Sequence, residues 1–348
     1  MKRGRPSVKR LLILILVSAA LWSGYWLYGA SASKSAFAAW FEERRSEGWV
    51  AEYAALALQG FPNRFDTTFT DLALADPDTG WAWDAPFFQL LALSYKPNHV
   101  IAVWPDSHRI ATPQGSFDLT QAEMQASVVL WPSTDLALDR VRLVADTVQI
   151  TASDGSTTAA SALRMAAERL GPEGQAATDA PGDGATRYRI ALSAEGFAPD
   201  SALRQRIDPT DRLPRTLDAL RADVTLGFDR PWDRRSVEQA RPQPQMISLR
   251  LAEARWGELE LLAAGDLEID ADGEATGRIT VKAQNWREIL RLARASGELP
   301  EGLADTLEQG LGLLAGRNDG IDIPLDFRGG RIWIGPLPVM ESPVFQLR

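Results

Sequence analysis

Apolar and polar positions follow different patterns in different parts of this chain. Leu11 to Tyr28 is an apolar run without one charged residue. Five basic residues precede it: Lys2, Arg3, Arg5, Lys9 and Arg10. As a helix rising about 1.5 Å per residue, the run measures roughly 27 Å, close to the thickness of a bilayer's hydrocarbon core. The sequence therefore predicts a cytoplasmic basic tail over residues 1–10 and a transmembrane anchor over residues 11–28.

The basic flank also predicts the orientation of the anchor. Basic flanks stay in the cytoplasm, so the chain is expected to cross once, with its N-terminus inside and everything after Tyr28 outside. A cleaved signal peptide is the alternative, because Ala30-Ser31-Ala32 has the small-x-small form of a cleavage site. The run is longer than the usual signal core of about 7–15 residues, which favours an uncleaved anchor. Four aromatic residues at its exit end favour the same conclusion: Trp22, Tyr25, Trp26 and Tyr28.

A short membrane-proximal helix is predicted over residues 33–47. Phe37, Trp40 and Phe41 would share one of its faces. Such a helix either lies in the membrane interface or packs as a stalk on the domain that follows. The second interpretation is favoured, because most apolar stripes belong to a core.

From Gly48 onward, apolar and polar residues alternate with a period of two. Phe65, Thr67 and Phe69 alternate with polar residues, and turn signals stand at Gly60–Asn63 and Asp76–Gly80. Short alternating runs separated by turns are typical of an antiparallel meander. Further candidate strands are Phe87–Tyr95, Val100–Trp104, Ala122–Trp131, Leu138–Val144, Val148–Thr151, Tyr188–Leu192, Leu220–Phe228, Ile247–Leu251, Leu259–Ile269, Ile279–Ala283, Ile321–Phe327 and Arg331–Ile334.

Three helices are predicted among these strands. Thr158–Leu170 is rich in Ala and Leu and is followed by Gly171. Asn285 is a candidate N-cap, with Glu288 completing a capping box. A further helix, over about Glu301–Ala315, has leucines at helical spacing.

These patterns predict an α+β, mainly β fold. A transmembrane helix would precede a large curved antiparallel sheet, half-barrel-like, with a few packed helices. The predicted parts are an N-terminal β-rich half (48–170), a flexible loop (171–186) and a C-terminal β-rich half (187–348) with a helical pair near 285–315. Whether the halves form one sheet or two lobes stays open. One face of the sheet is apolar, and it must be buried by curling, by helices or by a ligand.

Composition excludes some functions. Residues 1–32 hold five of the 37 Lys and Arg and none of the 46 Asp and Glu, which leaves the rest of the chain near −14. The strong negative charge of the residues after 32 argues against binding to nucleic acid, which is itself negatively charged. The absence of cysteine excludes disulfides, thiolate catalysis and cysteine-ligated metals.

Several short motifs resemble catalytic or binding sites but lack the context these need. Ser31–Lys34 matches S-x-x-K but lies at the membrane exit. Gly310–Ala315 matches G-x-G-x-x-A, yet it lies in a helical segment rather than after a strand. Glu268–Gly273 resembles the start of a calcium loop, but Ile279 stands where the loop needs a bidentate Glu. An acidic hairpin turn is the favoured interpretation there, with weak divalent binding as the alternative.

The two histidines, His99 and His108, have no partners at ligand spacing. We therefore predict no catalytic, cofactor-binding or metal-binding residues, no cofactor and no enzymatic activity. Acidic pairs such as Asp270 and Asp272 keep a glycosidase as a remote option, but carboxylates on one hairpin rarely face each other across a cleft.

Four features together carry a resemblance to a known family. The anchor, the Gly60-Phe61-Pro62 turn before a Phe-Thr-Phe strand, the Leu-rich helical pair and the closing Gly330–Pro338 segment resemble the bacterial domain of unknown function 2125 family. More distantly, the layout is similar to AsmA-like envelope proteins, some of which are implicated in moving lipids. The resemblance implies a bacterial inner-membrane anchor with a periplasmic β-rich body. It assigns no active residues.

Two functions are compatible with these patterns. The first is an envelope protein that binds lipid or a lipidated ligand in a curved-sheet groove and supports envelope biogenesis. The second is a periplasmic scaffold with a self-packed core that binds other envelope proteins. The expected partners are thus the inner membrane, through the N-terminal helix, and lipid or envelope proteins, with no nucleic acid.

Overall fold

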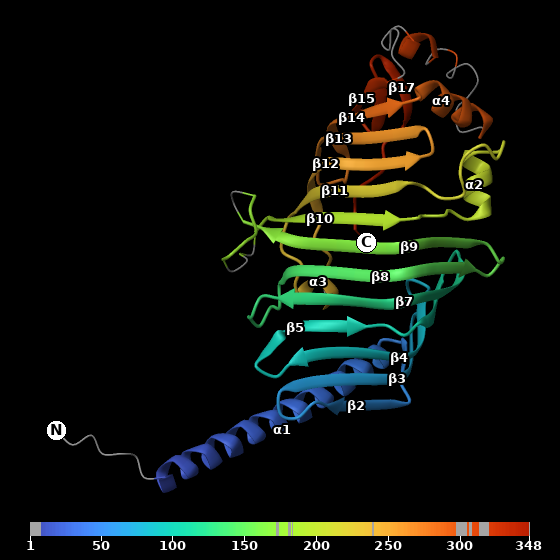
Figure 1. Ribbon diagram of the computed structural model, residues 1–348. Coiled ribbons are helices and arrows are strands. Elements are labelled where there is room, and N and C mark those ends of the chain that lie inside the picture. Colours follow the sequence, from blue (N-terminus) through green and yellow to red (C-terminus); the bar gives the residue numbers. More distant parts are fainter. Residues whose placement is uncertain are drawn as a thin grey trace. The chain divides into compact units, whose positions relative to one another are not determined.

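A computed structural model describes residues 8–347, with gaps at 172–173, 180–181, 183, 239, 297–304, 306–307 and 313–319 (Figure 1). The helices with described bounds are α1 (Val8–Ser46), α2 (Ser201–Ile207), α3 (Arg235–Glu238) and α4 (Trp286–Ala295). The strands are β1 (Val50–Glu52), β2 (Ala55–Gln59), β3 (Arg64–Asp76), β4 (Trp81–Leu93), β5 (Lys96–Val103), β6 (Ser107–Thr112), β7 (Gly115–Leu130), β8 (Leu138–Ala152), β9 (Thr157–Leu170), β10 (Thr186–Glu195), β11 (Ala219–Phe228), β12 (Pro244–Trp256), β13 (Leu259–Ile269), β14 (Ala275–Gln284), β15 (Gly320–Arg328), β16 (Arg331–Ile334) and β17 (Leu337–Glu341).

The chain divides into two compact units, Met1–Ser116 and Phe117–Arg348. Both are built mainly from antiparallel strands, which confirms the predicted fold class. The division does not fall at the predicted loop, residues 171–186. β9 and β10 flank that segment and pair residue by residue from Leu170–Arg187 to Ala162–Glu195. The two predicted halves are therefore joined inside the second unit.

In the first unit, β3 is the central strand. It pairs with β2 and β1 along one edge and with β4 along the other, and β4 in turn pairs with β5 and β6. The turn signals at Gly60–Asn63 and Asp76–Gly80 are confirmed, since they join β2 to β3 and β3 to β4.

Helix α1 is continuous from Val8 to Ser46, so the predicted anchor and membrane-proximal helix are one element. It is long and apolar enough to cross a membrane. Its second half packs on strands as favoured above: Phe41 is buried, and the ring of Phe37 lies 5.2 Å from that of Phe69 in β3. An unbroken helix forms because no Pro or helix-ending turn separates the two segments.

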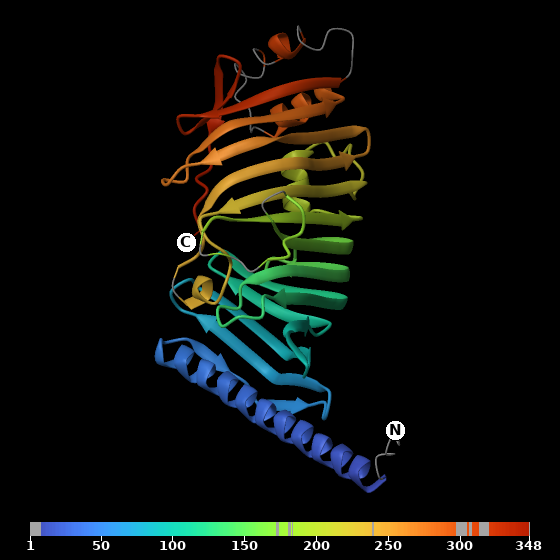
Figure 2. The same cartoon turned by 90° about the vertical axis from the view of Figure 1, so that its left-hand side faces the viewer.

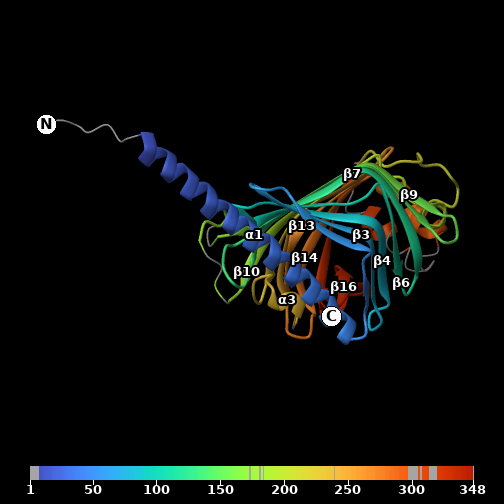
Figure 3. The same ribbon diagram turned by 90° about the horizontal axis from the view of Figure 1, so that it is seen from below.

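The second unit is a meander in which each strand from β8 to β16 pairs with the strand before it and the strand after it along the chain. Figure 2 shows these strands stacked in sequence order. Viewed along the stack in Figure 3, the strands bend into an arch, with α3 on its inner side. This matches the expected half-barrel-like curvature.

Two predicted helical features are wrong. Thr158–Leu170 is strand β9, not a helix, and Asn285 is a left-handed residue whose side chain makes no capping hydrogen bond. Helix α4 still begins at Trp286, because its first turn is closed by the carbonyl of Asn285, which accepts from the backbone N–H of Glu288. Of the helix predicted over Glu301–Ala315, residues 305 and 308–312 are helical and the rest lies outside the described residues.

Candidate functional site: the apolar face of the meander

The inner face of the meander carries three adjacent rows of apolar residues, which we call the three rungs. Each rung is traced by following register partners from strand to strand. The first rung is Ala126, Leu143, Met165, Leu192, Ala222, Ala252, Ala263, Val281 and Ile323. The second is Val128, Val141, Ala167, Ile190, Val224, Leu249, Gly265, Ile279 and Leu325. The third is Ala145, Leu163, Ala194, Leu220, Ala254, Leu261, Ala283 and Ile321. No rung contains a polar or charged side chain.

The opposite face of the same strands is ionic. One of its rows runs Arg140, Glu168, Arg189, Thr225, Ser248, Asp266, Arg278 and Asp326. Arg189 donates two hydrogen bonds to Asp223, at 2.9 and 2.6 Å, which lowers the pKa of that carboxyl. Arg278 likewise lowers the pKa of Asp326. Because charges lie on one side and aliphatic groups on the other, the ionic face is the solvent-facing one and the apolar face is the one that needs cover.

The centre of the apolar face is not fully covered by the described residues. Leu192 is 38% exposed, and its register neighbours Met165 and Leu143 are partly exposed. A groove of about 290 Å³ is lined by these three residues and their neighbours along β8, β9 and β10, which include Arg142 and Arg164. Leaving aliphatic surface in water costs about 25 cal/mol per Å², so a row of partly exposed aliphatic residues favours a covering partner.

One end of the apolar face is closed by the connection between β11 and β12. Tyr188 donates to the carbonyl of Leu138 at 3.3 Å and accepts from the backbone N–H of Trp232 at 3.2 Å. Burial raises the pKa of Tyr188, so its hydroxyl stays protonated as a donor. The rings of Phe228 and Trp232 meet edge to face, 5.7 Å apart. These contacts fix the connection over the ends of β8, β10 and β11.

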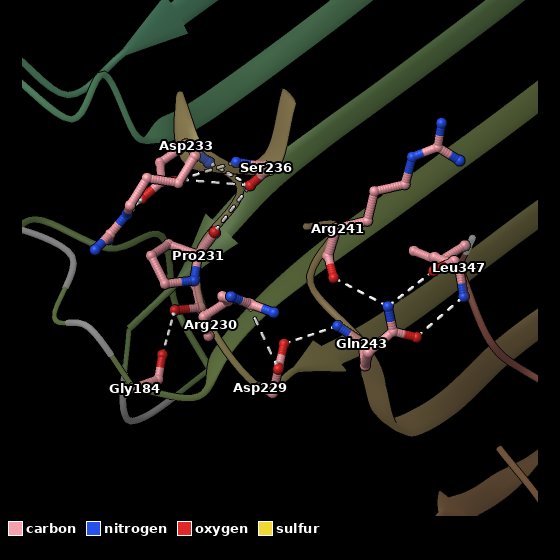
Figure 4. Close-up of polar contacts among 11 residues, drawn as sticks. Gly184, Asp229, Arg230, Pro231, Asp233, Ser236, Arg241, Gln243 and Leu347 are labelled. Atoms are coloured by element: carbon pink, nitrogen blue, oxygen red, sulfur yellow. Dashed lines mark hydrogen bonds and ion pairs between the residues drawn. The ribbon is translucent and has the colours of Figure 1, made fainter. Parts of the chain in front are cut away.

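Polar contacts within the connection hold it in shape (Figure 4). Asp233 donates its backbone N–H to the hydroxyl of Ser236 at 2.9 Å, and its carboxylate accepts from the Ser236 N–H at 3.3 Å. Gln243 clamps the C-terminal segment: its side chain donates to the Leu347 carbonyl at 2.9 Å and accepts from the Leu347 N–H at 3.1 Å. Both pairs are structural, because each side chain satisfies backbone groups of the chain itself.

The other end of the apolar face is covered by α4. Trp286 and Leu290 pack with Ala283 and Ile321 of the third rung in one buried cluster. Beside this cluster, α2 and α4 leave an apolar groove of about 520 Å³. Its apolar lining includes Ile207, Leu217, Trp256, Leu259, Leu261 and Ile289. Because Leu261 belongs to the third rung, this groove is continuous with the apolar face.

The motifs noted in the sequence occupy ordinary structural positions among the described residues, and Leu311 of the G-x-G-x-x-A motif packs in one cluster with Ala283 and Ile321. Ser31–Lys34 is inside α1, and Gly310–Gly312 is helical, with the rest of that motif outside the described residues. The carboxylate of Asp270 accepts from the backbone N–H groups of Asp272 and Glu274, as expected for a hairpin turn. His108 is buried and its Nδ1 accepts from Trp83 Nε1 at 2.8 Å, as expected for an ordinary strand residue.

The residues that sequence reasoning missed are those of β9. Leu163, Met165 and Ala167 each belong to a rung, but they lie in the segment predicted to be helical. The available signal was the alternation of these residues with Arg164 and Glu168. It was outweighed by a composition of strong helix formers.

Comparisons with known proteins place the chain in one family. No curated protein and no solved structure matches it. The more distant likeness to AsmA-like envelope proteins is thus not shown. A family model described as "Uncharacterized protein conserved in bacteria (DUF2125)" matches residues 26–343, which is all of the chain except its first 25 and last five residues. The chain therefore belongs to the DUF2125 family.

Proposed function

We propose that this protein is a membrane-anchored, periplasmic lipid-binding protein that supports envelope biogenesis. In this proposal α1 anchors the chain in the bacterial inner membrane with its N-terminus in the cytoplasm. The apolar face of the meander holds the acyl chains of a phospholipid or of a lipidated ligand. No catalytic step is part of the proposal. The observation that carries it is the set of three uncharged rungs with a partly exposed centre at Leu192.

The size and chemistry of the face support acyl chains as the occupant. The β13–β15 part of the first rung packs against core clusters, but its members from Leu143 to Ala252 are at least partly exposed. Neighbouring strands lie about 4.8 Å apart, so this stretch of five strands is roughly 19 Å long. One leaflet of a hydrocarbon core is about 15 Å thick, so the stretch is long enough for an acyl chain. The rungs offer no polar group to a polar ligand, whereas aliphatic side chains suit methylene groups. An apolar helix in the same chain would keep the face near a source of lipid.

The test is native mass spectrometry with lipid extraction on the full-length chain, purified from its own membranes in mild detergent. We expect a phospholipid or a lipid-like mass bound in stoichiometric amount. Leu192→Glu should reduce the bound lipid several-fold, because it places a charge at the centre of the first rung. Thr225→Glu is the matched control: it adds the same charge on the opposite face, in the row between Arg189 and Ser248, and Thr225 does not line the groove.

A clean protein mass for the wild-type chain would contradict lipid binding. It would favour the scaffold function, in which the exposed centre of the face contacts another envelope protein. If both variants lost lipid equally, the loss would come from the added charge itself and not from a change to the apolar face.

A further inference from the structure

We propose that two turns of the first unit enter the outer headgroup region of the membrane beside α1. The first turn, Gly60–Arg64, joins β2 to β3, and the second, Leu93–Lys96, joins β4 to β5. We call them the two tips. The proposal rests on the membrane anchoring by α1 that the proposed function includes. It adds a second, β-sheet contact between the protein and the lipid surface.

The length of free helix is the first argument. Contacts between α1 and the tips begin at Trp22, whose Nε1 donates to the Pro62 carbonyl at 3.0 Å. From Leu11 to Leu21 the apolar helix is eleven residues long, about 16 Å, whereas a hydrocarbon core is about 30 Å thick. The membrane must therefore extend along α1 past Trp22, to the level at which the tips lie.

The outward side of α1 shows where the membrane ends. Leu27 and Tyr28 are 62% and 77% exposed, so apolar side chains continue to face outward beyond Trp22. The next exposed positions are Ser31, Ala32 and Lys34, so the outward side turns small and polar there. The boundary thus falls between Tyr28 and Ser31, six or more residues past Trp22, or about 9 Å. That depth matches the 5–10 Å by which interfacial protein segments penetrate a bilayer, by order of magnitude.

Backbone carbonyl groups of the tips accept hydrogen bonds from side chains of α1, as a site with little water requires. Trp26 Nε1 donates to the Arg64 carbonyl at 2.8 Å, and the Tyr25 hydroxyl donates to the Ser94 carbonyl at 2.6 Å. Together with Trp22, three aromatic donors of α1 satisfy three carbonyl groups of the tips. In a membrane each unsatisfied backbone group costs several kcal/mol, whereas water would satisfy them at no cost. Ser94, which is fully buried, links the tips: its backbone N–H donates to the Asn63 carbonyl at 2.8 Å.

The side chains of the tips are those of a membrane interface. Phe61, Leu93 and Tyr95 are 57%, 38% and 64% exposed. Arg64 and Lys96, both exposed, flank them. Aromatic rings favour the headgroup level, and long basic side chains extend from there toward phosphate groups. We therefore assign the tips to phospholipid headgroups, not to another protein.

The test uses the absence of cysteine, which makes single labelling sites clean. The full-length chain is prepared as Leu16→Cys, Phe61→Cys, Tyr95→Cys and Asp78→Cys. Each is labelled with an environment-sensitive fluorophore and reconstituted in vesicles of phosphatidylethanolamine and phosphatidylglycerol that contain lipids with a nitroxide near the top of the acyl chain. Asp78 is the matched control, because it lies in the turn at the opposite end of the β3–β4 hairpin and is exposed.

We expect nitroxide quenching at Phe61 and Tyr95 to exceed that at Asp78 several-fold, with strong quenching at Leu16. If Leu16 is quenched while Phe61 and Tyr95 behave like Asp78, the inference about the tips is wrong and the anchoring stands. If Leu16 is not quenched either, the anchoring itself is wrong, and the inference falls with it.

Discussion

At the scale of a single residue, His108 shows how burial changes the response of this protein to pH. The side chain is 5% exposed, and its Nδ1 accepts from Trp83. In the neutral ring Nε2 therefore carries the hydrogen, and this atom has no partner among the described residues. Burial lowers the pKa of His108, because the charged ring would lose its hydration.

This lowered pKa predicts a loss of stability in mild acid. Below the unfolded pKa of about 6.5 the unfolded chain binds a proton that the folded chain does not, so the free energy of unfolding falls as pH drops toward the folded pKa. We expect His108→Gln, which keeps an acceptor for Trp83, to reduce the drop in melting temperature between pH 7.5 and pH 5.5. An unchanged drop in His108→Gln would contradict the prediction.

At the scale of an element, β9 shows where local sequence preference and tertiary pairing disagree. Apart from Thr157, Thr158 and Ser161, every residue of this segment is Ala, Leu, Met, Arg or Glu, all of which favour helix. In the folded chain it pairs along most of its length with β8 on one side and β10 on the other. Two sets of ladder hydrogen bonds, and partial burial of Met165 and Leu163 on the apolar face, outweigh a preference worth tenths of a kcal/mol per residue.

The strand assignment predicts the sign of one substitution. Ala166 lies on the outer face of β9, and Ala166→Val should raise the free energy of unfolding by up to about 1 kcal/mol, since β-branched residues favour strands. In a helix the same change would lower it. Chemical denaturation measures the difference, and Ala38→Val in α1 is the control with the opposite expected sign. A destabilised Ala166→Val would contradict a strand at this position.

The connection between β11 and β12 predicts a second effect at this scale. Tyr188→Phe removes one donor and one acceptor that hold this connection, so it should lower the free energy of unfolding by about 1–2 kcal/mol. Thermal unfolding checks the size of the effect. Tyr95→Phe is a suitable control because Tyr95 is 64% exposed, and we expect no change there. A neutral Tyr188→Phe would show that the connection is held by its aromatic packing instead.

Most elements could be predicted from the sequence because their signals are local. The turns at Asp76–Gly80 and Asp270–Gly273 and the alternation around Phe65–Phe69 each depend on a few neighbouring residues. The candidate face could be predicted only as a one-sided sheet. Its continuity depends on register, which brings together Leu143, Met165 and Leu192 from three strands, and no local pattern encodes that pairing.

At the scale of the whole molecule, lipid binding predicts a linked change in stability. A ligand that binds the folded state stabilises it by RT ln(1 + [L]/Kd), about 2.7 kcal/mol at a hundred times Kd. We expect added phospholipid to raise the melting temperature of the wild-type chain and of Thr225→Glu, but not of Leu192→Glu. Without lipid, Leu192→Glu should melt close to the wild type because Leu192 is 38% exposed. If lipid raised the melting temperature of all three proteins, it would bind somewhere other than the centre of the apolar face.

The strand-by-strand order of the meander also determines how this protein can fold. Each strand from β8 to β16 finds its partners immediately before and after it in the chain, so most contacts are short in sequence and their loop-closure entropy is small. Hairpins can therefore form in succession as the chain emerges, without waiting for a distant segment. After each step, the strand that has just paired would present its unpaired edge to the strand that follows it in the chain. Once one hairpin of this unit has formed, we therefore expect folding to spread from it by adding one neighbouring strand at a time.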